Sequence, residues 1–189
     1  MCHALLQCPN FFRLLLRIDE ELAGETRAGG CPCGGVLHQA NYPRKPKGCL
    51  KELQADYASR FSFCCHRCRK RCTSVSVRFL GRRVYVAVAM VLLSTRRAAT
   101  MAASPLCASL EIPLSTLTRW RHWWRHEFAL TPLWQAACAR FMPPVAAAQL
   151  PLSLIERFAA SSAAQQLTRL LYFLTPLTVR RPVELQEGR

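Results

Sequence analysis

Apolar residues recur at helical spacing near the start of the chain, over residues 11–23. The apolar face of this amphipathic helix comprises Phe11, Leu14, Leu15, Ile18 and Leu22. Gly24 follows, and the residues after it are rich in glycine. Because glycine weakens a helix, we expect the helix to end at Gly24 and residues 24–30 to form a hinge.

The pattern changes between residues 31 and 83, where prolines and glycines interrupt every longer element. Short apolar runs at residues 36–38, 60–63 and 75–80 predict strands. These runs hold too little apolar material for a core of their own. A bound metal would therefore have to support the fold of this segment.

The rest of the chain has the apolar spacing of helices, separated by prolines and short turns. Helices are predicted at residues 84–100, 104–110, 113–128, 151–160 and 162–174. Glu111 and Ile112 form the turn between the second and third of these helices, and the last dozen residues are expected to fray. The fold class that this pattern predicts is mainly α.

Charge is extreme and uneven along the chain. The formal net charge is +15, and the sequence pI is about 10.0. Residues 31–83 carry 12 basic and 2 acidic side chains, whereas residues 1–30 carry 3 and 4. So local an excess indicates an anion-binding surface, and a general solubilising charge is the simpler alternative.

Cysteines cluster in the same basic segment, once in Cys31-Pro-Cys33 and again in Cys64-Cys65-His66-Arg67-Cys68. Zinc takes four tetrahedral ligands, preferably thiolates held on tight turns. We expect a Zn²⁺ ion bound by Cys31, Cys33, Cys65 and Cys68. The second pair has the usual knuckle spacing, and the glycines after the shorter first pair give its turn backbone freedom.

Other ligand sets remain open at this stage. Cys64 is an alternative to Cys65, and the further candidates are Cys49, Cys72 and His38. The thiols can also be free or buried without a metal. A Cys-x-Cys redox site is a further alternative, although no thioredoxin-like βαβ pattern surrounds it.

The cysteine usage favours a reducing compartment. The chain has 11 cysteines, an odd number, and they cluster rather than spread. No secretory signal is visible, so we expect a cytoplasmic protein with reduced thiols. The most apolar run, residues 84–93, is too short to cross a bilayer, and no membrane partner is expected.

The helix over residues 113–128 is basic and rich in tryptophan. Its predicted packing stripe comprises Leu114, Leu117, Trp120, Trp124 and Phe128. The opposite, readout face includes Ser115, Thr116, Arg119 and His122. A tight turn before a basic last helix is the helix-turn-helix plan, in which that helix enters the major groove of double-stranded DNA. The alternative is an ordinary solvated basic helix.

Further basic clusters suit the phosphates of a DNA backbone, where point charges suffice. They comprise Arg44, Lys45, Lys47, Arg69, Lys70, Arg71, Arg78, Arg82 and Arg83, together with Arg67 in the second cysteine cluster. His122 and His126 lie four residues apart, a spacing that can chelate a metal, but we interpret them as surface or phosphate contacts.

These features predict four consecutive parts. They are an N-terminal helix and hinge (1–30), a zinc-ribbon module (31–83), a three-helix helix-turn-helix unit (84–130) and a helical C-terminal segment (131–189).

Several sequence segments are similar to uncharacterised bacterial proteins that accompany mobile elements. They are CPCGGVLHQANYPRKPKG, FSFCCHRCRKRCTSVSVRFLGRRVYVAV, LEIPLSTLTRWRHWWRHEF, FMPPVA and LPLSLIERF, within residues 30–175. The order of zinc ribbon and helix-turn-helix resembles the DNA-binding N-terminal part of insertion-sequence transposases. The resemblance implies a transposition-related accessory or regulatory factor, working with a separately encoded transposase or recombinase. The chain departs from the pattern at its Cys-x-Cys pair and at Glu111, where a turn glycine is common.

No catalytic constellation is found in the sequence. A transposase core needs three separated carboxylates, but no aspartate follows Asp56, and the later glutamates fall on predicted helices or the tail. We therefore expect no enzyme activity. The alternatives to DNA readout are a zinc-ribbon adaptor for RNA or an acidic protein, and a degenerate remnant of a mobile element.

Overall fold

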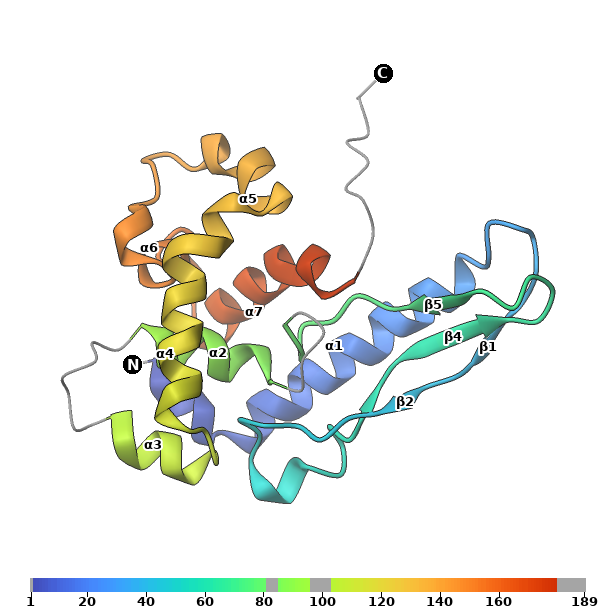
Figure 1. Cartoon of the computed structure of the whole chain (residues 1–189), viewed down its shortest axis with the longest axis horizontal. Helices are drawn as coiled ribbons and strands as arrows, with labels where there is room; N and C mark the ends of the chain where they lie inside the picture. Colours follow the sequence, from blue (N-terminus) through green and yellow to red (C-terminus); the bar gives the residue numbers. More distant parts are fainter. Residues whose placement is uncertain (1, 81–84, 96–102, 180–189) are drawn as a thin grey trace.

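The computed structural model describes residues 2–80, 85–95 and 103–179. The fold is mainly α, with a narrow β ribbon beside the long first helix and the remaining helices gathered at the other end (Figure 1). The helices are α1 (Pro9–Ala28), α2 (Ala87–Ser94), α3 (Ala103–Ser109), α4 (Leu114–His122), α5 (Pro132–Ala137), α6 (Leu152–Ile155) and α7 (Ala163–Leu174). The strands are β1 (Leu37–Gln39), β2 (Tyr42–Pro43), β3 (Ser59–Arg60), β4 (Ser62–Cys65) and β5 (Arg71–Thr73).

Short 3₁₀ segments connect these elements. They are η1 (Cys2–Gln7), η2 (Lys51–Leu53), η4 (Phe128–Leu130), η5 (Cys138–Arg140), η6 (Ala147–Gln149) and η7 (Thr175–Thr178).

Helix α1 is longer than predicted and continues through Gly24, so the expected helix end and hinge at residues 24–30 are wrong. Tertiary contacts hold its last turns in place. Ala23 is buried against the ribbon, and the Thr26 hydroxyl donates to the Leu22 carbonyl at 2.8 Å and lies 3.2 Å from Ser74 Oγ. These contacts offset the roughly 1 kcal/mol that glycine costs inside a helix.

The ribbon is built from antiparallel strands in the order β1-β4-β5, with β2 and β3 as a separate pair. Strand β1 opposes β4, with Leu37 across from Cys65. The predicted strands at residues 36–38 and 60–63 correspond to β1 and to β3 with β4. The strand predicted over residues 75–80 is wrong, because only Phe79 forms a bridge there, with Val86.

A tight turn joins α3 to α4. The N–H of Ile112 donates to the Cys107 carbonyl at 2.8 Å, and Glu111 between them has φ 54°. This bond and the left-handed residue form a Schellman cap, in which glycine is usual at the position of Glu111.

In place of the predicted helix over 84–100, α2 covers Ala87–Ser94, and residues 84 and 96–100 lie outside the described chain.

The predicted packing stripe of α4 is largely buried. Leu117, Trp120, Trp124 and Phe128 are each at most 4% exposed. Beyond His122 the helix widens into a π-helical segment, η3 (Trp123–Glu127), which keeps Trp124 and Phe128 on the buried side. Leu114 is 62% exposed, a correction to the prediction. Side chains of a helix lean toward its N-terminus. Because Leu114 is the first residue of α4, its side chain projects beyond the helix end and is not packed over an earlier turn.

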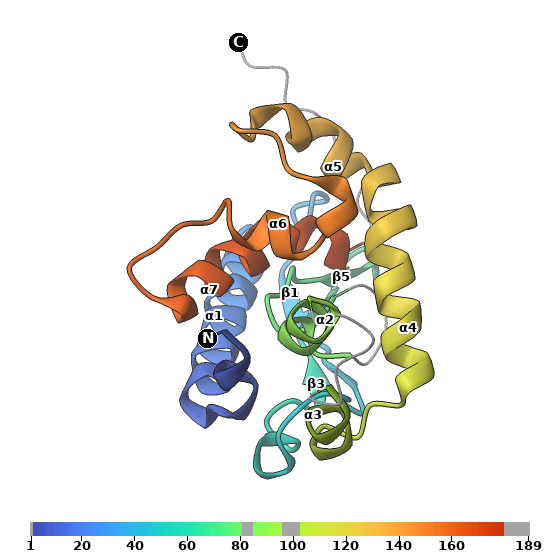
Figure 2. The same ribbon diagram turned by 90° about the vertical axis from the view of Figure 1, so that its left-hand side faces the viewer.

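One hydrophobic cluster runs through the predicted parts of the chain. It includes Leu6 and Phe12 from the N-terminal part, Tyr57 and Phe79 from the ribbon segment, and helix residues as far as Leu174. The view from the end of the molecule shows α2 enclosed between α1, α4 and α7 (Figure 2). The predicted boundaries therefore do not separate independent cores. Among the described residues, a second, small cluster lies at the ribbon tip and is formed by Ala23, Leu37, Phe63 and Cys65.

A buried ion pair fixes the base of the ribbon to α1. Arg78 and Asp19 are 0% and 1% exposed, and Arg78 Nε donates to Asp19 Oδ2 at 2.8 Å. The guanidinium also donates to the carbonyls of Asp56 and Ser59, and it lies over the rings of Tyr57, Phe61 and Phe79. The expectation that Arg78 contacts phosphate is therefore wrong. Arg82 and Arg83 lie outside the described residues.

Candidate metal centre and basic surface

The four cysteines predicted to bind metal lie together at the tip of the ribbon. Their Sγ atoms are all within 4.8 Å of one another. The Cys31–Cys33, Cys31–Cys68 and Cys33–Cys65 pairs are each 3.5 Å apart. This separation is too long for a disulfide bond of about 2 Å. It is close to the roughly 3.8 Å between sulfurs that share a tetrahedral metal ion with bonds of about 2.3 Å.

The first cysteine pair is held by a tight glycine turn. The N–H of Gly34 donates to the Cys31 carbonyl at 2.8 Å, and the Cys31 N–H donates to the Gly35 carbonyl at 3.3 Å. Gly34 has φ 75°. A Cβ on Gly35 would lie 2.5 Å from Cys65 Sγ and 2.8 Å from Arg67 Cβ. The absence of a side chain at residue 35 thus leaves the space in which the sulfurs converge.

The second pair sits on the β4–β5 turn. The N–H of Cys65 donates to the Lys70 carbonyl at 3.0 Å, and the Arg69 N–H donates to the Cys65 carbonyl at 3.1 Å. Arg69 occupies the left-handed region with φ 57°. The turn also points the N–H of Cys68 at Cys65 Sγ, 3.5 Å away. Backbone donors directed at a sulfur are the arrangement that stabilises a thiolate.

The thiols of this centre differ in acidity. The pKa of Cys65 is lowered from 9.0 to about 6, chiefly by the hydrogen bond from the Cys68 backbone N–H. Burial acts in the opposite direction but is outweighed. At Cys31 the backbone N–H of Cys33 also acts to lower the pKa, but burial and the neighbouring thiols raise it to about 12. Cys65 therefore ionises more readily than Cys31, and a bound cation would favour the ionised form of Cys31.

The structure distinguishes the alternative ligands. Cys64 alternates to the other face of β4, and its Sγ donates to the Arg69 carbonyl at 3.5 Å, away from the four-sulfur cluster. Cys49 lies in the main core, where burial raises its pKa to about 12. The rings of His38 and His66 pack against each other, 5.9 Å apart. Cys72 lines a pocket beside the cluster but is not part of it. Four cysteines at this spacing can hold a metal ion.

Two basic clusters predicted separately from the sequence meet at Tyr42. The guanidinium carbon of Arg44 lies 4.6 Å from the Tyr42 ring centroid, and that of Arg71 lies 5.8 Å from it. Arg71 also donates to the Ala40 carbonyl at 2.8 Å. The aromatic ring and this hydrogen bond fix two guanidinium groups close together, although their charges repel.

Arg44 and Arg71 belong to a larger set that we call the basic ribbon. The basic ribbon comprises Arg44, Lys45, Lys47, Arg67, Arg69, Lys70 and Arg71. All of these side chains are exposed except that of Arg44, which is half-buried. Over the described chain, the only ion pairs are Lys51–Glu111 and Arg78–Asp19, so no carboxylate neutralises the basic ribbon.

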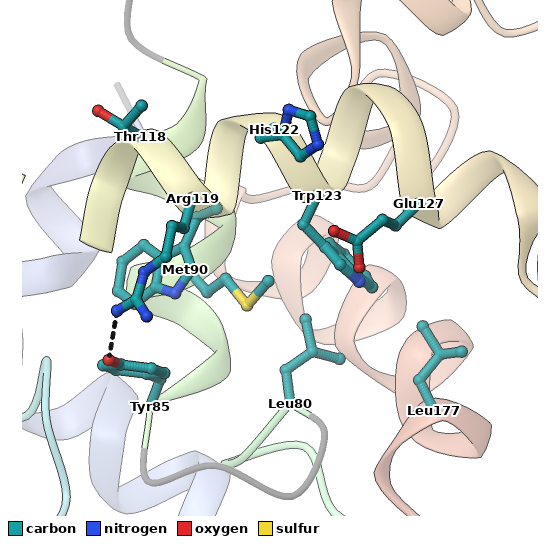
Figure 3. A pocket seen from close by; sticks show the side chains of 10 residues that line it. Leu80, Tyr85, Met90, Thr118, Arg119, His122, Trp123, Glu127 and Leu177 are labelled. Carbon is teal, nitrogen blue, oxygen red and sulfur yellow. Dashed lines mark hydrogen bonds between the residues drawn. The ribbon is translucent and has the colours of Figure 1, made fainter. Parts of the chain in front are cut away.

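The predicted readout face of α4 is only partly available. Ser115 and His122 are exposed, but Thr116 is 3% exposed, so its predicted DNA contact is corrected. Thr116 lies next to the buried Leu117 and one helical turn before the buried Trp120, so it falls on the packed side of α4. Arg119 is exposed, and its guanidinium donates to Tyr85 Oη at 3.4 Å (Figure 3). It also donates to Thr116 Oγ1 at 3.0 Å.

Comparison with known proteins identifies no relative: no protein family, curated protein or solved structure matches the chain. Within the described ranges, no helix has both the length and the apolarity that crossing a membrane requires.

Proposed function

We propose that this protein binds double-stranded DNA through the basic ribbon and α4, and that a structural Zn²⁺ ion holds the ribbon tip. The observation that carries the proposal is the meeting of two basic clusters around Tyr42 without carboxylate partners. One of these basic residues, Arg71, also lines a pocket together with Cys31, Cys33 and Cys68. Uncompensated guanidinium and ammonium groups suit the phosphates of a duplex.

Zinc is the metal that this donor set favours. Four thiolates in a closed tetrahedral arrangement are typical of structural zinc sites, in which no position is left open for a substrate. The ion would supply folding free energy to a tip whose own apolar cluster is small. The ligands would be Cys31, Cys33, Cys65 and Cys68.

The contacts divide into two kinds. The basic ribbon would hold phosphates without reading sequence, while Ser115, Arg119 and His122 on α4 would face base edges in the major groove. The turn before α4 supports this assignment, because its Schellman cap places α4 across the end of α3. By resemblance to transposase N-terminal parts, the duplex would be the end of a mobile element. A separately encoded recombinase would then be the protein partner.

A second candidate function follows from the readout face. Thr116 is buried and Arg119 is turned onto Tyr85, which favours a weaker dependence on base sequence. The protein would then be a zinc-ribbon adaptor whose basic ribbon holds RNA or an acidic protein.

The test is a salt titration of affinity for a fluorescent duplex, using zinc-loaded protein. The Arg69→Gln/Lys70→Gln variant removes two exposed charges from the basic ribbon, and Arg13→Gln/Arg17→Gln removes two from the exposed side of α1. Each lost phosphate contact lowers the slope of log affinity against log salt by about 0.9. We expect a decrease of about 2 for the ribbon variant and almost none for the α1 variant.

Equal slopes for both variants would overturn the ribbon assignment, because general charge would then explain the binding. Arg119→Ala separates the two candidate functions. If Arg119→Ala loses the parent's preference among duplex sequences, base readout is supported. If the variant binds duplex DNA as the parent does, and both bind RNA more tightly than duplex DNA, the adaptor is supported.

A further inference from the structure

A pocket of about 580 Å³ opens between α4 and the start of α2 (Figure 3). Helix α4 and its π-helical continuation contribute Arg119, Trp123 and Glu127 to its wall, and Tyr85 lies opposite. Its volume is within the range of small-molecule sites. Of the proposed DNA contacts, Arg119 and His122 line it.

The pocket is apolar over most of its wall. Leu80, Met90 and Leu177 face Trp123 across the opening (Figure 3). Trp123 is only half-buried, and its ring is braced from behind by Trp124 at 4.9 Å and Phe128 at 5.5 Å between centroids. A braced aromatic ring opposite flexible aliphatic side chains suits a flat apolar body.

The charges of the pocket are placed asymmetrically. Arg119 donates to two neutral hydroxyls, those of Tyr85 and Thr116, and is in neither of the ion pairs found in the described chain. Glu127 lies two turns further along the same helical run and also lines the pocket. An anionic group would be attracted at the Arg119 end and repelled at the Glu127 end.

We propose that this pocket binds a planar, apolar molecule with one negative charge, such as an aromatic carboxylate. The carboxylate would accept hydrogen bonds from Arg119 and from the Tyr85 hydroxyl, and the ring would pack against Trp123. The Glu127 end excludes a second anionic group, so dicarboxylates are disfavoured.

Ligand binding would also compete with DNA for Arg119. This part of the inference rests on the proposed function, since a guanidinium that holds a carboxylate in the pocket is withdrawn from base edges. The ligand is therefore expected to weaken duplex binding.

The first experiment uses calorimetric titration with 2-naphthoate, without DNA. We expect saturable binding that weakens at least about tenfold in Arg119→Met, since a charge-assisted hydrogen bond is lost. The matched control is Arg125→Met, which changes an exposed arginine on the same helical run outside the pocket and should bind as the parent does. The neutral 2-naphthamide should bind at least about tenfold more weakly than 2-naphthoate.

Absence of 2-naphthoate binding, equal binding of the amide, or equal losses in both variants would each overturn the pocket assignment. The second experiment adds 2-naphthoate to the protein–duplex complex. Reduced duplex affinity in the parent supports coupling through Arg119, and unchanged affinity overturns it. A protein that binds 2-naphthoate but no duplex retains the pocket and loses the proposed function.

Discussion

At the scale of single residues, Asp19 is a buried carboxylate that satisfies three donors. Its carboxylate accepts from Arg78 Nε at 2.8 Å, from the Val77 N–H at 2.7 Å and from the Ser76 hydroxyl. Both charges are out of water, so each depends on the other for compensation. Removing one partner of such a pair strands the other, and this is more harmful than replacing both with apolar groups.

We therefore predict that Asp19→Ala lowers the free energy of unfolding by about 3–5 kcal/mol. Glu20→Ala, which changes the exposed neighbour, should stay within about 0.5 kcal/mol of the parent. Urea denaturation followed by circular dichroism measures both. A loss below about 1 kcal/mol for Asp19→Ala would show that water reaches Arg78.

Gly35 gives a second prediction, for the metal centre. Gly35→Ala places a methyl group 2.5 Å from Cys65 Sγ, so metal affinity should fall at least about tenfold, as expected when a site loses its support. Gly34→Ala is the control, because its Cβ meets nothing within 4 Å, although its φ of 75° adds backbone strain. Competition with a chromogenic zinc chelator measures the affinity, and retained affinity in Gly35→Ala contradicts the placement of the sulfurs.

Residue types and spacing predicted the cluster of four cysteines and preferred Cys65, but they left Cys64 open as an alternative. Strand alternation distinguishes them, and it becomes known only when Leu37 is paired with Cys65 in the β1–β4 register. Arg78 was predicted as a surface charge for a similar reason. Its partner Asp19 is 59 residues away in sequence, so nothing local marks it as buried.

At the scale of elements, the helix positions were more predictable than their ends. Apolar spacing placed α1, α4 and α7, because longer amphipathic helices repeat their pattern over successive turns. The end of α1 was not predictable from Gly24, since the contacts of Ala23 and Thr26 with the ribbon decide it. The run at residues 75–80 is apolar because it is buried beside α1, and it does not form a strand.

Helix α1 offers a clean test of this account. A Cβ on Gly24 would meet nothing within 4 Å, so Gly24→Ala should raise the free energy of unfolding by about 0.5–1 kcal/mol. Gly48→Ala should do the opposite, by about 1–3 kcal/mol, because Gly48 has φ 82° and the added atom would lie 2.7 Å from Ala89 Cβ. Thermal melts of both variants check the signs. A destabilised Gly24→Ala would mean that α1 ends where the sequence alone predicted.

At the scale of the whole molecule, the main core and the ribbon tip are separate clusters joined by α1. The main core draws on residues from Leu6 to Leu174, whereas the tip cluster holds only Ala23, Leu37, Phe63 and Cys65. A cluster that small provides little burial free energy, so we expect the stability of the tip to depend on a bound metal ion. Sequence patterns cannot reveal this division, because it depends on which distant segments share a core.

Metal removal should accordingly unfold one part of the molecule. On chelation, amide protons of β1, β4 and the two cysteine turns should exchange rapidly, while those of α2 and α7 stay protected. Hydrogen exchange with mass spectrometry makes this comparison, and the four-serine variant of Cys31, Cys33, Cys65 and Cys68 is expected to behave like the chelated protein. Uniform loss of protection would mean that tip and core unfold together.

The ion pair between α1 and the ribbon base also limits how this protein can be divided or transplanted. A fragment that begins at Cys31 would contain the four clustered cysteines and the basic ribbon, but the buried Arg78 would lack its counter-ion Asp19. Recombination at the cysteine boundary would therefore yield an insoluble or unfolded product, even with every predicted ligand in place. A fragment that folds by itself must therefore include α1 from its first residues. A four-cysteine ribbon of this kind in another chain would need a helix of its own that supplies a buried carboxylate.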